Sequence, residues 1–189
     1  MHDDMHNSTI SLLSLILGKR AAKRLYRGSL VELFLAEKLP EDAKVRMRAT
    51  RELVRRWMEE ELKHGPVLGD PKGVRAYLRV HYAGVEREVF SCLFLDNRHR
   101  LISAENLFFG TIDGASVHPR EVVKRALEVN AAAVILAHNH PSGVADASQA
   151  DELITRRLHE ALAIVDIRCL DHLIVGDTKV TSLAERGLM

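Results

Sequence analysis

Residues 131–143 read Ala-Ala-Ala-Val-Ile-Leu-Ala-His-Asn-His-Pro-Ser-Gly and join an apolar run to a group of polar side chains. The run from Ala131 to Leu136 is wholly apolar, which is typical of a buried strand. Side chains of an extended segment alternate between its two faces, so His138 and His140 project from the same face. Both imidazoles can therefore point at one metal ion.

A third candidate ligand follows in the sequence. Pro141 and Gly143 interrupt regular structure, and Ser148-Gln149-Ala150-Asp151 then opens a long amphipathic stretch that predicts a helix. An aspartate in the first turn of that helix can return to the two histidines. Two histidines and one aspartate supply three ligands and leave a fourth position open, as in a catalytic zinc site. His138, His140 and Asp151 are therefore candidate ligands of Zn²⁺.

The same residues have other interpretations. Ser148 and Asp151 also match a helix capping box, which needs no metal. A single histidine is more often structural than a ligand, although two at this spacing after a buried strand are hard to explain by packing. The tripeptide His138-Asn139-His140 also suggests an HNH nuclease. The residues of that motif are spread over a longer hairpin and helix, and this argues against a nuclease.

Several separated motifs together resemble a known family. His138-x-His140-Pro141 followed by Ser148-x-x-Asp151 resembles the JAMM motif of the JAB/MPN metalloproteases. The chain more specifically resembles the bacterial RadC-like proteins over about residues 66–189, through the segments His-Asn-His-Pro-Ser-Gly, Gly110-Thr111, Val117-His118-Pro119-Arg120-Glu121 and Asp171-His172. The resemblance implies a JAB/MPN-like mixed β-sheet flanked by helices. It also implies zinc-dependent cleavage of a peptide or isopeptide bond by metal-activated water, with His138, His140 and Asp151 as ligands.

The resemblance further implies two catalytic residues. Peptide hydrolysis needs a carboxylate that takes a proton from water and delivers it to the leaving amine. The resemblance places this carboxylate at Glu88, whereas composition alone does not separate Glu88 from Glu86, two residues earlier on the same face. Ser148 would donate a hydrogen bond to the oxyanion of the tetrahedral intermediate. Its alternative role is that of a helix N-cap.

The whole chain is consistent with a cytoplasmic protein. Its 189 residues allow one good core, or one domain with a small appendage. The 27 basic and 26 acidic residues leave a net charge of +1, which gives no general attraction to nucleic acid or anionic membranes. Cys92 and Cys169 lie in apolar runs, and no secretory signal is recognised. The apolar stretch Leu12–Leu17 is too short to cross a membrane.

Residues 1–65 are predicted to be an all-helical segment. Apolar spacing predicts helices from Ser8 to about Arg27, from Leu30 to Leu39 and from Glu41 to about Leu62. The segment resembles a degenerate form of the helix-hairpin-helix that precedes the JAB-like domain in RadC-like proteins. Such hairpins hold DNA phosphates through a glycine-containing turn. The corresponding turn, Leu39–Ala43, has no glycine and two acids, which argues against DNA as a partner.

Residues 66–189 are predicted to be the JAB/MPN-like domain. Helices and strands interleave along it, so the predicted class is α/β. The expected helices are 67–79, one after His118 and one after Asp151, and the expected strands are 88–95, 100–103, 108–112, 131–136, 167–175 and 179–183. The leading hypothesis is a zinc hydrolase that acts on a peptide or protein. The alternative is a non-catalytic or DNA-associated module, but the complete set of five site residues favours catalysis.

Overall fold

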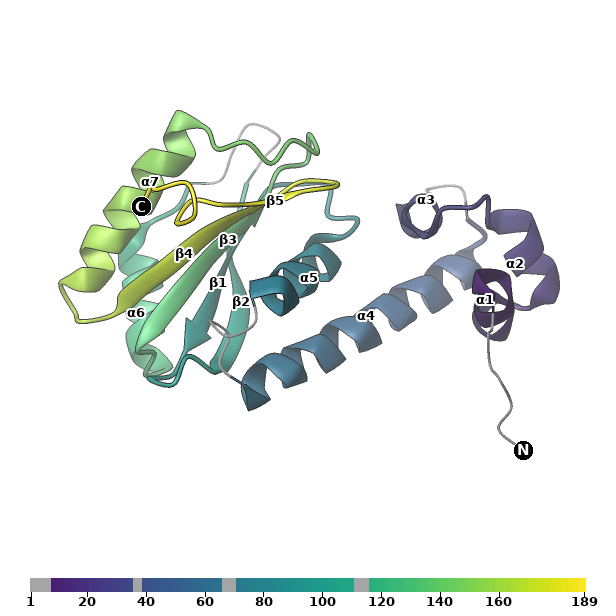
Figure 1. Cartoon of the computed structure of the whole chain (residues 1–189), viewed down its shortest axis with the longest axis horizontal. Helices are drawn as coiled ribbons and strands as arrows, with labels where there is room; N and C mark the ends of the chain where they lie inside the picture. The colour runs from purple at the N-terminus through teal and green to yellow at the C-terminus, as the bar shows by residue number, and fades with distance from the viewer. Residues whose placement is uncertain (1–7, 36–38, 66–70, 111–115) are drawn as a thin grey trace. The chain divides into compact units, whose positions relative to one another are not determined.

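A computed structural model describes residues 8–35, 39–65, 71–110 and 116–189 of the chain (Figure 1). The chain divides into two compact units, Met1–Arg55 and Arg56–Met189. Helices make up the described part of the first unit, and the second unit contains a five-stranded mixed sheet with helices against it. The predicted fold class, an α/β sheet domain preceded by helices, is confirmed.

The first unit contains short helices. They are α1 (Thr9–Leu17), α2 (Lys19–Leu25), α3 (Leu30–Leu35) and the beginning of α4 (Glu41–His64). The prediction of one helix from Ser8 to Arg27 is wrong, because Gly18 has a φ of +83° and separates α1 from α2. Glycine adopts this backbone conformation without a steric penalty. The last part of the predicted helix 30–39 includes residues 36–38, which lie outside the described residues.

Helix α4 spans the division between the two units. The sequence predicts it over Glu41–Leu62, and it ends two residues later, at His64. Leu62 belongs to the core of the second unit. That residues 1–65 and 66–189 are separate domains stays a prediction. In the part of the chain that the structure describes, no helix is long and apolar enough to cross a membrane.

The sheet of the second unit has the strand order β2-β1-β3-β4-β5. Its strands are β1 (Val89–Leu95), β2 (Leu101–Phe109), β3 (Ala133–Asn139), β4 (Arg168–Val175) and β5 (Val180–Ser182). β3 and β4 are parallel, and the other neighbouring strands are antiparallel. The central strands β1 and β3 are buried along their whole length, as expected for strands covered on both faces.

Two strand predictions need correction. The sequence predicts separate strands at 100–103 and 108–112, whereas β2 runs without interruption from Leu101 to Phe109. Polar Glu105 and Asn106 are tolerated inside it because β2 is an edge strand and is only partly buried. Residues 111–112 lie outside the described part. β3 also extends beyond the predicted 131–136, so that His138 is part of the strand itself.

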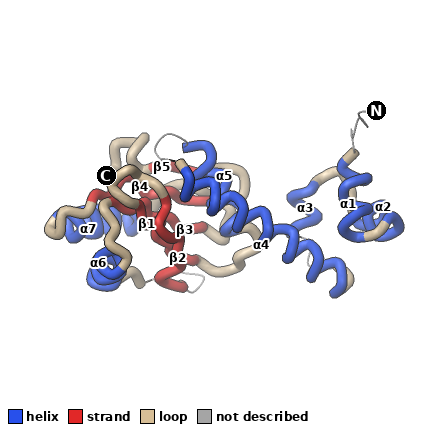
Figure 2. Tube along the Cα trace, turned by 90° about the horizontal axis from the view of Figure 1, so that it is seen from below, coloured by secondary structure: helices blue, strands red, loops and turns tan. Residues whose placement is uncertain are grey.

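Helices cover the two faces of the sheet (Figure 2). Helix α5 (Pro71–Tyr82) lies on one face, and α6 (Pro119–Glu128) and α7 (Gln149–Ala163) lie on the other. Ile135 and Ala137 of β3 pack in the α5 core, while Val134 and Leu136 pack in the core that contains α6 and α7 side chains. This alternation directs the side chain of His138 towards α7.

Candidate metal centre

His138 and His140 occupy the end of β3. His138 pairs with Phe90 of β1 and with Ile174 of β4, and only 1% of its side chain is exposed. The His140 amide donates to the Val175 carbonyl at 2.9 Å, which keeps the residue aligned beside β4. His140 Nδ1 lies 2.7 Å from the Val144 carbonyl oxygen. Because a carbonyl only accepts, Nδ1 carries the proton and Nε2 of the neutral ring is left as an acceptor.

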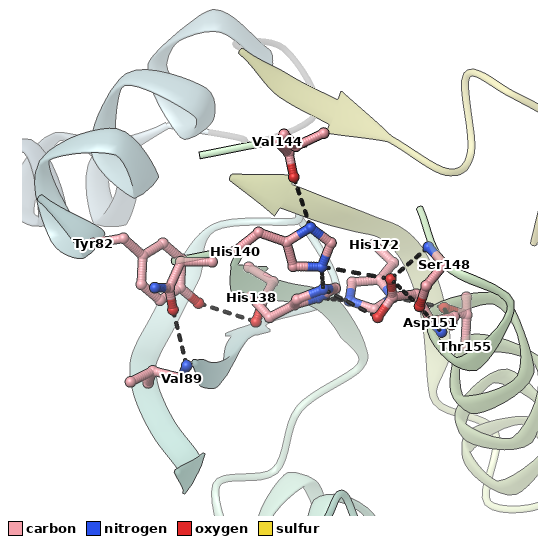
Figure 3. A network of polar contacts seen from close by, with 11 residues as sticks. Tyr82, Val89, His138, His140, Val144, Ser148, Asp151, Thr155 and His172 are labelled. Carbon is pink, nitrogen blue, oxygen red and sulfur yellow. Dashed lines mark hydrogen bonds and ion pairs between the residues drawn. The ribbon is translucent and has the colours of Figure 1, made fainter. Parts of the chain in front are cut away.

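The two histidines meet Asp151 at a single point (Figure 3). His138 Nε2 lies 2.9 Å from His140 Nε2 and 3.2 Å from Asp151 Oδ1, and His140 Nε2 lies 3.5 Å from Asp151 Oδ2. A tetrahedral zinc ion with bonds of about 2.0–2.1 Å holds its ligand atoms about 3.3–3.4 Å apart. One ligand atom from each residue lies within 4.8 Å of the other two, so the three residues can share one zinc ion after a small adjustment.

Asp151 also completes the N-terminus of α7. The Ser148 amide and the Ser148 hydroxyl each donate to Asp151 Oδ2 at 2.7 Å, and the Asp151 amide donates to Ser148 Oγ at 3.1 Å. This is a capping box. The cap holds Oδ2 and leaves Oδ1 turned towards His138, so one carboxylate serves the helix end and faces the histidines at the same time.

Interactions within the cluster lower the pKa of Asp151 and raise the pKa of His140. Burial alone would raise the pKa of Asp151, but hydrogen bonds from His138, His140 and Ser148 outweigh it and lower that pKa. The pKa of His140 is raised, chiefly by its interaction with Asp151, and the charge of Glu88 adds to this effect. The cluster therefore stabilises positive charge, which is what a cation site requires.

Glu88 lies just before β1 and is half-buried, whereas Glu86 is exposed. Phe90 pairs with His138 in the antiparallel register, and Glu88 precedes Phe90 by two residues, on the same face of the chain. The Glu88 carbonyl accepts the Gly110 amide at 2.9 Å, which ties this position to the end of β2. The charge of Glu88 helps to raise the pKa of His140, while the assignment of Glu88 rather than Glu86 as the catalytic carboxylate stays a prediction.

Asn139 has a role that the sequence did not reveal. Its side chain points to the opposite face of β3 and is 4% exposed. Oδ1 accepts the Val89 amide at 2.8 Å, and Nδ2 donates to the carbonyls of Arg87 at 3.0 Å and Val85 at 3.4 Å. These three backbone groups flank Glu88. The residue between the two histidines therefore fixes the segment that carries the carboxylate.

His172 and Thr155 extend the cluster into the core, behind His138 (Figure 3). His138 Nδ1 lies 2.8 Å from His172 Nε2, and His172 Nδ1 lies 2.6 Å from Thr155 Oγ1. Both His172 and Thr155 are fully buried. Burial, followed by the nearby charge of His138, lowers the pKa of His172 well below its usual value. The sequence placed His172 on a strand beside a neighbour but did not assign Thr155 to the site.

Two glycines shape the loop that follows the histidines. Gly143 has a φ of +80°, and a Cβ at this position would overlap the Asp177 carboxylate. A Cβ at Gly176 would overlap the Gly143 carbonyl oxygen. The Asp177 amide donates to that same oxygen at 3.0 Å. The positive φ therefore explains Gly143 of the His-Asn-His-Pro-Ser-Gly segment, and close backbone approach at Gly176 holds the loop against the end of β4.

The fold and the cluster together are those of a JAB-type domain. Residues 68–188 match the family model described as the RadC-like JAB domain. The chain therefore belongs to the RadC-like JAB domain family.

Relatives carry the name UPF0758 protein. The chain is 64% identical to the UPF0758 protein of Nitrosococcus oceani over 143 residues, which are 76% of this chain and 64% of that protein. It is 56% identical over 165 residues to the one from Thioalkalivibrio sulfidiphilus, covering 87% of this chain and 74% of that protein. For the Vibrio cholerae protein the identity is 55% over 168 residues, with 85% and 75% covered. The chain thus spans less than two thirds of the length of the Nitrosococcus relative.

Proposed function

We propose that this protein is a zinc-dependent hydrolase that cleaves a peptide or isopeptide bond. One observation carries the proposal: donor atoms of His138, His140 and Asp151 converge on one point, and the charge of half-buried Glu88 acts on His140. Three neutral or anionic ligands with an open fourth position are typical of catalytic zinc. A bound Zn²⁺ would act as a Lewis acid and lower the pKa of a coordinated water molecule.

His138, His140 and Asp151 would hold the metal ion, and each is fixed by a further contact. His138 is held by His172, His140 by the Val144 carbonyl, and Asp151 by the Ser148 cap. Ligands that are oriented in advance lose little freedom on binding, and such supporting contacts are typical of metal centres. The donor set of imidazoles and carboxylate matches the preferences of zinc.

Glu88 would act as the general base and acid. Its charge acts on His140, and its carboxylate is not part of the group of three donors. It would accept a proton from the attacking water and deliver it to the leaving amine. The hydrogen bonds of Asn139 to the flanking backbone support this role, because a general base must be held in position.

Ser148 would donate to the oxyanion of the tetrahedral intermediate. It is exposed at the N-terminus of α7, beside Asp151. Its hydroxyl donates to Asp151 Oδ2, but its backbone amide donates to the same oxygen at the same distance of 2.7 Å. The hydroxyl can therefore turn to a substrate oxygen while the amide keeps Asp151 in place.

The alternative of a DNA-associated module has less support. Glu41 and Asp42 occupy the first turn of α4, where a phosphate would otherwise meet free backbone amides. Negative side chains at this position repel DNA. These acids argue against phosphate binding at this helix end, and the basic residues further along α4, beginning with Lys44, Arg46 and Arg48, are what the DNA alternative rests on.

The proposal is tested by assaying the purified protein against a library of peptide and isopeptide substrates. We expect at least one substrate to be cleaved, the cleavage to stop with a chelator, and zinc to restore it. A protein that binds zinc stoichiometrically and cleaves none of the substrates would favour the non-catalytic module instead.

A further inference from the structure

We propose that His172 and Thr155 are positioning residues that fix the tautomer of His138, so that its Nε2 lone pair faces the metal ion. This inference rests on the proposed zinc site, but it does not depend on hydrolysis. It follows from the directions in which a chain of three hydrogen bonds can run. The chain starts at a group that can only accept and ends at the ring of a candidate ligand.

The starting point is the Asp151 carbonyl oxygen. Thr155 Oγ1 donates to this oxygen at 2.5 Å, across one turn of α7. Threonine hydroxyls in helices commonly bond in this way to the carbonyl four residues earlier. A carbonyl oxygen has no proton to give, and a hydroxyl has only one. When the Thr155 hydroxyl proton points to Asp151, Oγ1 can act towards His172 only as an acceptor.

The next step concerns His172. Its Nδ1 lies 2.6 Å from Thr155 Oγ1, so Nδ1 must carry the proton of that hydrogen bond. The ring is fully buried and contacts a hydroxyl and another imidazole, with no carboxylate in hydrogen-bond contact, so it is neutral. A neutral imidazole with a protonated Nδ1 has an unprotonated Nε2. His172 therefore presents an acceptor to His138.

The last step reaches the ligand. His138 Nδ1 lies 2.8 Å from His172 Nε2 and must donate to it. The His138 proton is then on Nδ1, and Nε2 is free to bind a metal ion on the side of His140 and Asp151. If the Thr155 hydroxyl turned away from Asp151 and donated to His172 Nδ1, the other two hydrogen bonds would reverse. The His138 proton would then be on Nε2 and point at Asp151, and Nε2 of this tautomer cannot act as a ligand.

The path also connects two ligands. It begins on the backbone of Asp151 and ends on the ring of His138, and it passes through α7, β4 and β3. The helix turn that presents the carboxylate thus also sets the tautomer of the histidine opposite. Outer hydrogen-bond partners of this kind raise metal affinity because they remove tautomers that cannot bind.

The test compares Thr155→Val with Thr155→Ser. Valine keeps the shape but removes the hydroxyl, so the protonated Nδ1 of His172 would be buried without an acceptor whenever zinc is bound. We expect Thr155→Val to weaken zinc binding by about 10- to 100-fold, measured by competition with a chromogenic chelator. Serine restores the hydroxyl and should restore affinity. The metal-free melting temperature is measured in parallel, because His172 Nδ1 loses its partner in Thr155→Val whichever tautomer it adopts and some stability is lost as well.

A matched control is available at Thr181. It is also a buried threonine, and its hydroxyl makes no hydrogen bond in the described part of the chain. Thr181→Val makes the same chemical change away from the path and should leave zinc affinity at the wild-type value. A second pair tests His172 itself: His172→Leu should weaken zinc binding, whereas His172→Gln keeps an acceptor at the position of Nε2 and should bind more tightly than His172→Leu.

The ring protonation can be observed directly. In the zinc-loaded protein, long-range ¹H–¹⁵N spectra should show a protonated Nδ1 on both His138 and His172 and an unprotonated Nε2 on His172. A protonated His172 Nε2, a Thr155→Val protein that binds zinc as tightly as the wild type, or a Thr155→Ser protein as weak as Thr155→Val would overturn the inference. A wild-type protein without zinc affinity would overturn the metal site and this inference together. Zinc binding without hydrolysis would contradict only the proposed function.

Discussion

The two faces of β3 carry buried polar groups of opposite character. On the face towards α7, His138 Nε2, the His140 ring and Asp151 leave donor atoms converging on one point. On the face towards α5, Asn139 satisfies three backbone groups, and the Tyr82 hydroxyl donates to the Ala137 carbonyl at 3.0 Å. On the first face the polar atoms contact one another and converge on one point, whereas on the second face they are hydrogen-bonded to the backbone.

This difference separates a binding role from a positioning role within three consecutive residues. Imidazole nitrogens and a carboxylate that converge on one point form a donor set that a cation would stabilise. Polar groups that satisfy one another indicate a structural element. His138 and His140 belong to the first kind, and Asn139 belongs to the second.

The largest effect is expected from His140→Ala, which removes one of three donors. Zinc content should fall from stoichiometric to trace levels, as measured by elemental analysis of the purified protein. His159→Ala is the matched control, because His159 is an exposed histidine on α7. Full zinc stoichiometry in His140→Ala would mean that this residue is not a ligand.

Glu88→Gln should reduce catalytic turnover without reducing zinc binding. The amide keeps the shape of the side chain but cannot take a proton, so turnover should fall by about 10²- to 10⁴-fold while zinc content is retained. Glu86→Gln, at an exposed position, should be nearly silent in the same assay. Loss of zinc in Glu88→Gln would mean that Glu88 is a ligand. A loss of activity only in Glu86→Gln would mean that Glu86, and not Glu88, is the general base.

Asn139→Leu tests the face of β3 towards α5, where Asn139 is hydrogen-bonded to the backbone. The change leaves the Val89 amide and the Arg87 carbonyl without their partner, so unfolding free energy should fall by about 1–3 kcal/mol in denaturant titration. Turnover should also fall, because the segment that carries Glu88 is released, but zinc should stay bound. If Asn139→Leu lost zinc as completely as His140→Ala, the two faces would not have separate roles.

Zinc affinity should depend on pH, because protons compete with zinc for the histidine on the face of β3 towards α7. Since the pKa of metal-free His140 is raised above its usual value, protons compete with zinc from above pH 6.5. Apparent zinc affinity should therefore fall as pH is lowered through this range, by up to about tenfold per pH unit for each proton released on binding. Burial raises the pKa of Tyr82 on the other face, so that group stays neutral. An affinity independent of pH between 6 and 8 would contradict the ligand assignment.

The smallest effect is expected in the first unit. With Glu41 and Asp42 at the start of α4, the full chain should not bind duplex DNA tightly at physiological salt. Fluorescence anisotropy with a labelled duplex should give a dissociation constant above about 1 μM, which is the tight end of the range for non-specific binding. A submicromolar constant that depends steeply on salt would mean that the basic residues of α4 do contact DNA.

Local patterns in the sequence predicted the sheet and the cluster. The apolar run before His138, the spacing of the two histidines and the Ser148–Asp151 box all act within a few residues. Thr155 and His172 are 17 residues apart and meet only because α7 packs on β4. Asn139 likewise reaches backbone about 50 residues earlier, through the pairing of β1 with β3. Such contacts depend on how the elements pack, and no spacing along the chain indicates them.

Anomalous diffraction at the zinc edge, from a crystal of the zinc-loaded protein, tests the central claim most directly. The account predicts one peak at the end of β3, within about 2.0–2.2 Å of His138 Nε2, His140 Nε2 and one Asp151 oxygen. The peak should lie on the α7 face, with Glu88 nearby but not bound to it. A peak ligated by other residues, or no peak in protein that contains zinc, would contradict the assignment of this face as the metal site.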